Sequence, residues 1–137
     1  MLDGLVSWGS GLNDLGQVVG RSNFSDTSGD QHAFRYVAGD WTDLGVLSGS
    51  ISEAFGINNR GQIVGESYAV SGTQIHAFVC EGGVMTDLGT LGGVGSSARG
   101  INERGQIVGY YYTASWIPRA FLCNPVVAVP GLFLLLD

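Results

Sequence analysis

The chain repeats itself three times. A nine-residue pattern, Ile-Asn-x-x-Gly-Gln-Ile-Val-Gly or a close variant, occurs at residues 12–20, 57–65 and 101–109. The tripeptide His-Ala-Phe occurs at 32–34 and 76–78 and returns as Arg-Ala-Phe at 119–121. The shared spacing of about 44 residues is typical of repeat architectures. It predicts a single repeat domain over residues 1–137, with repeats at about 11–50, 51–94 and 95–137.

Each repeat has the pattern of four short strands separated by turns. In the second repeat we expect strands at 54–58, 62–67, 75–80 and 84–88. Asn58 and Gly61 predict a tight turn between the first two strands, because asparagine bonds to nearby backbone and glycine adopts positive φ. In the third repeat the last strand is degenerate. No stretch combines a helical period with helix caps, so we expect an all-β fold.

Small and large side chains alternate along these strands. Ala54 precedes Phe55 and Ala77 precedes Phe78, so each sheet is predicted to have one flat face and one bulky face. Sheets of this kind are suited to stacking on copies of themselves, as propeller blades do. The sequence therefore predicts three consecutive four-stranded antiparallel β-propeller-type blades, a partial propeller. The alternative is a β-trefoil, which is also built from three four-stranded units.

Three blades are fewer than the four to eight of known propellers. The outer blades of a partial propeller expose apolar faces, and such faces are association sites. We therefore expect self-association through open blade faces, or additional repeats in a longer chain.

The charge composition excludes one class of partner. Six basic residues against twelve acidic ones give a net charge of −6, and only 13% of all residues are charged. Nucleic-acid binding needs clustered Lys and Arg, so we expect no nucleic-acid partner. We also expect no membrane span, since no apolar stretch approaches the roughly 20 residues that a spanning helix needs.

The combined motifs resemble those of the HAF repeat family, bacterial proteins named for the His-Ala-Phe tripeptide. The likeness covers about residues 11–122 and includes the segment Met-Thr-Asp-Leu-Gly-Thr-Leu-Gly-Gly at 85–93. Arg119 departs from the tripeptide pattern. The resemblance implies an extracellular or cell-surface location and repeated blades. It implies no catalytic residue, cofactor or ligand.

The two ends of the chain differ from the repeats. The first residues lack the charged region and apolar core of a signal peptide, and they look like the end of an earlier repeat. Residues 125–137 are apolar and are interpreted as the degenerate last strand. Two alternatives stay open for this tail: a shortened form of the sorting signal with which proteins of this repeat type often end, and a fragment or reading-frame artefact.

The two cysteines are interpreted as structural residues. Cys80 and Cys123 occupy equivalent positions of two repeats. A disulfide needs Cα atoms within about 7 Å, and equivalent positions of adjacent blades should lie farther apart. We therefore expect free, buried thiols that act as small apolar residues.

The histidines are interpreted in the same way. His32 with Asp43 and His76 with Asp87 recur at equivalent positions. A catalytic group is needed once, whereas a structural bond is needed in every unit, so we expect hydrogen bonds that bridge strands. No catalytic residue, cofactor or metal site is predicted.

The repeats differ most in the links between their second and third strands, at 21–30, 68–73 and 110–118. Variable loops on a fixed scaffold carry binding specificity. The third link contains Tyr110, Tyr111, Tyr112 and Trp116, and such rings stack on sugars or anchor a protein partner. The alternative for these residues is plain packing at a blade edge. The favoured hypothesis is a non-enzymatic binding or structural module of a secreted or surface bacterial repeat protein, with a glycan or protein ligand. The alternative is a fragment of a propeller-type glycan hydrolase or lyase.

Overall fold

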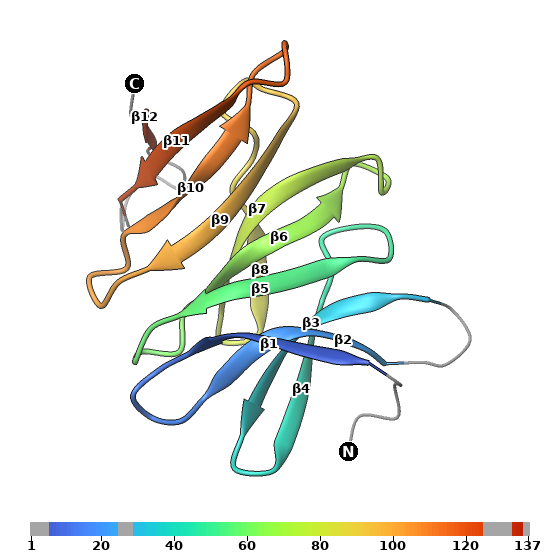
Figure 1. Ribbon diagram of the computed structural model, residues 1–137, viewed down its shortest axis with the longest axis vertical. Helices are drawn as coiled ribbons and strands as arrows, with labels where there is room; N and C mark the ends of the chain where they lie inside the picture. The colour runs from blue at the N-terminus through green and yellow to red at the C-terminus, as the bar shows by residue number, and fades with distance from the viewer. Residues whose placement is uncertain (1–5, 25–28, 125–132, 136–137) are drawn as a thin grey trace.

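The computed structural model describes residues 6–24, 29–124 and 133–135 (Figure 1). Within these ranges there is no helix, and the chain forms three antiparallel sheets in which strands follow one another in chain order. Sheet 1 contains β1 (Ser7–Leu12), β2 (Val18–Asn23), β3 (Gln31–Val37) and β4 (Asp40–Gly45). Sheet 2 contains β5 (Ser52–Ile57), β6 (Ile63–Ala69), β7 (Gln74–Glu81) and β8 (Val84–Asp87). Sheet 3 contains β9 (Gly95–Ile101), β10 (Ile107–Tyr112), β11 (Pro118–Cys123) and β12 (Phe133–Leu135). The all-β prediction is confirmed.

The turn between the first two strands of each sheet is built as the sequence predicts. The Asn58 side-chain oxygen accepts hydrogen bonds from the backbone N–H groups of Arg60 and Gln62, at 3.1 and 3.0 Å. Gly61 has a φ of 79°, which an L-residue rarely adopts. Asn13 and Asn102 bind their own turns in the same way. The four strands of the second repeat agree with their predicted bounds to within two residues.

The first strand of each sheet carries a β-bulge. The pairing of β1 with β2 shifts between Gly9 and Gly11, and that of β5 with β6 shifts between Ala54 and Gly56. The pairing of β9 with β10 shifts at the equivalent place, so that Arg99 is the extra residue. A bulge redirects the side chain of the extra residue.

Sheet 2 lies between sheets 1 and 3 (Figure 1), and each contact between sheets has its own apolar core. In the first core Val19 and Ala33 of sheet 1 pack with Ile57, Ile63 and Phe78 of sheet 2. In the second core Val64 and Ala77 of sheet 2 pack with Ala98, Ile107 and Phe121 of sheet 3. Sheet 2 is therefore buried on both faces, and a flat face meets a bulky one at each contact. In the described part of the chain the sheets do not close on one another.

The cysteines lie in these cores. Cys80 belongs to the first core and Cys123 to the second, and both are free and buried, as predicted. Burial raises the pKa of each thiol above its ordinary value of 9.0. A protonated, buried thiol is a poor nucleophile, so both act as small apolar residues.

The short strand β12 pairs antiparallel with β11, which gives sheet 3 a fourth strand in the apolar tail. The remainder of the tail and residues 1–5 lie outside the described residues, and so do the interpretations placed on them. Among the residues described, no helix is long and apolar enough to cross a membrane.

Candidate binding groove

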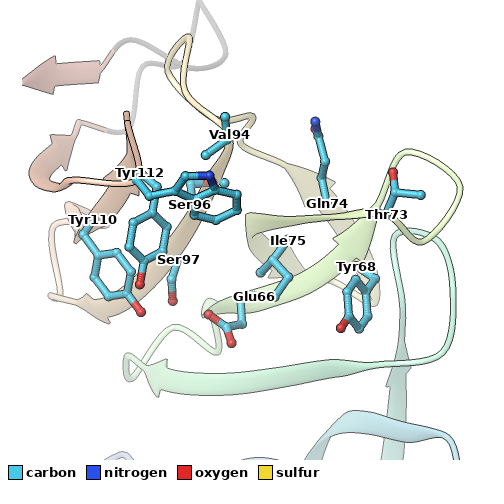
Figure 2. A pocket seen from close by; sticks show the side chains of 12 residues that line it. Glu66, Tyr68, Thr73, Gln74, Ile75, Val94, Ser96, Ser97, Tyr110 and Tyr112 are labelled. Carbon is cyan, nitrogen blue, oxygen red and sulfur yellow. The ribbon is translucent and has the colours of Figure 1, made fainter. Parts of the chain in front are cut away.

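A groove of about 370 Å³ lies between sheets 2 and 3. Figure 2 shows side chains approaching it from both sheets. Sheet 2 contributes Glu66, Tyr68 and Ile75, and sheet 3 contributes Ser97, Tyr110 and Tyr112. Trp116, from the loop between β10 and β11, completes the lining on the side of sheet 3. Four aromatic side chains thus line the groove together with aliphatic and polar ones.

The side of sheet 3 forms an aromatic wall, which we define as Tyr110, Tyr112 and Trp116. The ring centroids of Tyr110 and Tyr112 lie 5.4 Å apart with their planes nearly perpendicular, and those of Tyr112 and Trp116 lie 5.8 Å apart. The neighbouring Tyr110 phenol is the main reason why the pKa of Tyr112 is raised above its ordinary value of 10.0. Trp116 remains 68% exposed, so part of the wall is accessible from solvent.

The sequence-based placement of the tyrosines needs a correction. Tyr110, Tyr111 and Tyr112 do not lie in a loop: they form the end of β10, paired with β9 and β11. Aromatic residues favour extended strands, and here they prolong the pairing. Side chains alternate along a strand, so Tyr111 points to the opposite face from its two neighbours and does not line the groove.

Trp116 is the one member of the predicted set that lies in the loop. The loop is closed by hydrogen bonds from Thr113 N–H to the Ile117 carbonyl (3.0 Å) and from Trp116 N–H to the Thr113 carbonyl (2.8 Å). Trp116 has a φ of 60°, an uncommon value for a bulky residue. The tight loop thus places the indole beside Tyr112.

Charged side chains continue from the groove across all three sheets. Arg21 of β2 lies 3.2 Å from the Glu53 carboxylate of β5, and Arg99 of β9 lies 3.9 Å from the Glu66 carboxylate of β6. The Arg99 guanidinium also donates to the Tyr110 hydroxyl at 2.7 Å. We call Arg21, Glu53, Glu66 and Arg99 the charged row. The sequence did not predict this row, because its members are far apart in the chain.

The bulge of β9 explains how Arg99 reaches this position. Its guanidinium lies 4.0 Å from the Phe55 ring centroid and 5.2 Å from the Tyr110 ring centroid. These are distances at which a cation is attracted to an aromatic face. Arg99 therefore holds the Tyr110 phenol through a hydrogen bond and a ring contact together.

Two carboxylates within this row are direct neighbours. Glu53 and Glu66 are paired across β5 and β6. Burial, with a smaller contribution from the charge of Glu66, raises the pKa of Glu53, and Arg21 opposes the shift. The equivalent pairs in the other sheets are Trp8 with Arg21 and Ser97 with Tyr110. The residues at these positions vary between repeats inside the strands, and this variation is the sequence signal for the row.

The histidines lie outside this row and bridge strands as predicted. The His32 Nδ1 atom lies 2.9 Å from the Asp43 carboxylate across β3 and β4. The His76 Nδ1 atom lies 2.9 Å from the Asp87 carboxylate across β7 and β8. The described residues contain no group of three or more side chains suited to holding a metal ion.

The chain matches no family model, no curated protein and no solved structure. The groove and the repeat therefore carry the functional argument.

Proposed function

We propose that the chain is a non-enzymatic binding module of an extracellular or cell-surface bacterial repeat protein, and that its groove binds a glycan. The observation that carries this proposal is the aromatic wall, which lines a groove of about 370 Å³. Small-molecule sites have volumes of about 300–1,000 Å³ and combine apolar walls with a few polar groups. Sugar rings match this chemistry, because their C–H faces stack on aromatic rings while their hydroxyls form hydrogen bonds.

The polar groups of the groove support a sugar ligand. Glu66, Gln74 and Ser97 also line the groove and offer both donors and acceptors (Figure 2). Arg99 holds the Tyr110 hydroxyl in place, which reduces the entropy lost when a ligand binds. A protein ligand anchored on Trp116 is a second candidate, because this indole is 68% exposed. The bacterial and extracellular parts of the proposal rest on the family resemblance alone.

We further propose that the three sheets are consecutive blades of a partial β-propeller. Sheets that follow one another in the chain pack flat face to bulky face, with sheet 2 in the middle. A β-trefoil would arrange its three units around one axis and a common core. The presence of two separate cores supports blades instead.

The enzymatic alternative has one observation in its favour. Glycoside hydrolases use a pair of carboxyl groups, and the general acid has a raised pKa. Glu53 and Glu66 are such neighbours, and burial raises the pKa of Glu53. Each carboxylate also lies beside an arginine, however, at 3.2 Å for Arg21 and 3.9 Å for Arg99. Both carboxylates are thus engaged in ion pairs within the protein and are not free to approach a substrate, so we place binding first.

A glycan array followed by calorimetry tests this proposal. We expect the chain to bind a subset of glycans, and Trp116→Ala to weaken the strongest interaction at least about tenfold, the effect of losing about 1.4 kcal/mol. Trp8→Ala is the matched control, because Trp8 is a 41%-exposed tryptophan that does not line the groove. An unchanged affinity of Trp116→Ala would refute the groove as the site. Cleavage of the bound glycan, lost in Glu53→Gln, would establish the enzymatic alternative.

A further inference from the structure

Equivalent residues of the three sheets differ sharply in burial. Val19 of sheet 1 and Val64 of sheet 2 are fully buried beneath the next sheet, whereas Val108, the same residue in sheet 3, is 46% exposed. On the opposite face, Ile57 of sheet 2 is 8% exposed, whereas its equivalent in sheet 1, Leu12, is 68% exposed. Local sequence cannot explain this contrast, because the motif is the same. The difference is the neighbouring sheet.

The open side of sheet 1 is aromatic as well as aliphatic. Trp41 lies 4.7 Å from the Phe34 ring and 5.0 Å from the Tyr36 ring, measured between centroids. Phe34 is the equivalent of Phe78, which sheet 1 covers, but Phe34 is only 2% exposed because Trp41 lies beside it. The accessible part of this surface is therefore Trp41, which is 36% exposed, with Tyr36. We call this surface, with Leu12, the bulky open face. The flat open face is the opposite surface at the other end of the chain, with Val108 and the exposed Ala120 of sheet 3.

A hydrogen-bond ladder gives the contacts between sheets a direction. The Asn13 side-chain NH2 donates to the Asn58 carbonyl at 3.0 Å, and the Asn58 NH2 donates to the Asn102 carbonyl at 3.0 Å. Each NH2 also donates to the glutamine of its own turn, as does that of Asn102, to Gln106 at 2.8 Å. Within the described chain nothing accepts the second hydrogen of Asn102. The ladder ends on a donor at sheet 3.

At the other end the ladder begins on an acceptor. The Asn58 carbonyl accepts two hydrogen bonds, one from Gly61 in its own turn and one from Asn13. The Asn13 carbonyl accepts the equivalent bond from Gly16, and no described residue of a preceding sheet supplies the second. A carbonyl oxygen has two lone pairs, so Asn13 can accept one more hydrogen bond.

We propose that the flat open face of sheet 3 binds the bulky open face of sheet 1 in a second copy of this chain. The contact would continue the two interfaces already present within the chain. In it, Val108 would be covered as Val19 and Val64 are, and the Asn102 NH2 would donate to the Asn13 carbonyl of the second copy. This inference rests on the packing of the repeat and not on the glycan groove.

The docking is head to tail, since the two faces differ. Such a heterologous contact forms a ring if the rotation closes and an open assembly if it does not. Two copies joined through both pairs of faces would place six sheets in one ring, a number within the range of known propellers. The proposal needs only the contact between the two faces, whichever assembly results.

Sedimentation of the purified chain and two surface variants tests the proposal. Val108→Arg places a charge on the flat open face, and Leu12→Arg places one on the bulky open face. Both positions are exposed, so the fold should be retained, which circular dichroism checks. The unmodified chain should associate at micromolar concentration. Each variant alone should sediment as a monomer, with self-association weakened at least about a hundredfold by the unpaired charge.

Mixing the two variants provides the decisive measurement. Val108→Arg keeps an intact bulky face and Leu12→Arg keeps an intact flat face, so the mixture should form a complex containing one copy of each. Asn102→Asp should also weaken association, because it keeps the acceptor oxygen of the turn and removes the donor. The proposal is wrong if the unmodified chain stays monomeric, or if the mixed variants fail to associate. Loss of association in only one of the two arginine variants would also overturn it, since that result indicates a face binding to itself.

Discussion

Replacing Asn58 by alanine tests how much the ladder between sheets contributes to stability. Asn58 is 1% exposed, and its side chain forms four hydrogen bonds: two to its own turn backbone, one to the Gln62 side chain and one to the Asn102 carbonyl of the next sheet. Each buried hydrogen bond contributes about 1 kcal/mol net, and leaving partners unsatisfied adds to the cost. We expect Asn58→Ala to lower the free energy of unfolding by about 3–5 kcal/mol.

Asn102 is the matched control within the same motif. It forms the equivalent three hydrogen bonds inside its own repeat but lacks the bond to a further sheet, and it is exposed. Water replaces the lost bonds at an exposed turn, so Asn102→Ala should cost only about 1–2 kcal/mol. Asn13, which is 9% exposed and bonded to sheet 2, should lie between the two.

Urea unfolding and thermal unfolding, each followed by tryptophan fluorescence, measure these differences. The series is made in the Val108→Arg background, so that association through the flat open face does not bury Asn102. At about 3–5 °C per kcal/mol for a domain of this size, Asn58→Ala should lower Tm by about 10–20 °C. Equal losses for Asn58→Ala and Asn102→Ala would show that the bond between sheets contributes nothing measurable, and the ladder argument would then fail.

Two further substitutions probe packing and electrostatics. A Cβ added at Gly65 would lie 1.9 Å from the Glu53 carbonyl oxygen, so Gly65→Ala should cost more than about 3 kcal/mol. A Cβ added at Gly9 would make only an ordinary contact of 3.6 Å with Val18, and sheet 2 has alanine in the equivalent position, so Gly9→Ala should be neutral in the same urea experiment. Burial raises the pKa of Glu53 above its ordinary value of 4.5, so the folded state holds this proton more tightly than the unfolded state. The stabilisation from this proton is complete below the pKa that Glu53 has in the unfolded state, and it is lost as the pH rises through the pKa of the folded state. Between about pH 4 and 7 the Tm of Glu53→Gln should therefore fall less than the Tm of the unmodified chain. Glu81→Gln, at an exposed position, should behave like the unmodified chain, and identical pH profiles for all three proteins would contradict the assigned burial.

Much of the fold could be predicted from local chemistry. The turn at Asn58 and Gly61 is specified by residues within four positions of each other, and so are the strands on either side. The repeat then multiplies one local solution three times. The bridge between His76 and Asp87 was predicted from its recurrence, since a bond needed in every unit is structural. The free Cys80 was predicted because equivalent positions of adjacent blades lie too far apart for a disulfide.

The site was only partly predictable, because it depends on where strands end and which strands meet. The aromatic segment was recognised, but it was assigned to a loop, and the opposite direction of Tyr111 follows only from the strand that it extends. Arg99 and Glu66 are distant in the chain and come together through a bulge and the contact between two sheets.

The amino-acid sequence by itself determined the unit: its strands, its turns and the alternation of small and large side chains. These properties depend on neighbours within a few residues or on a period of two. Tertiary structure alone decided which side chains of each repeat are buried. Val64 and Val108 share the same motif, yet one is fully buried and the other is 46% exposed, because burial depends on whether another sheet lies against that face.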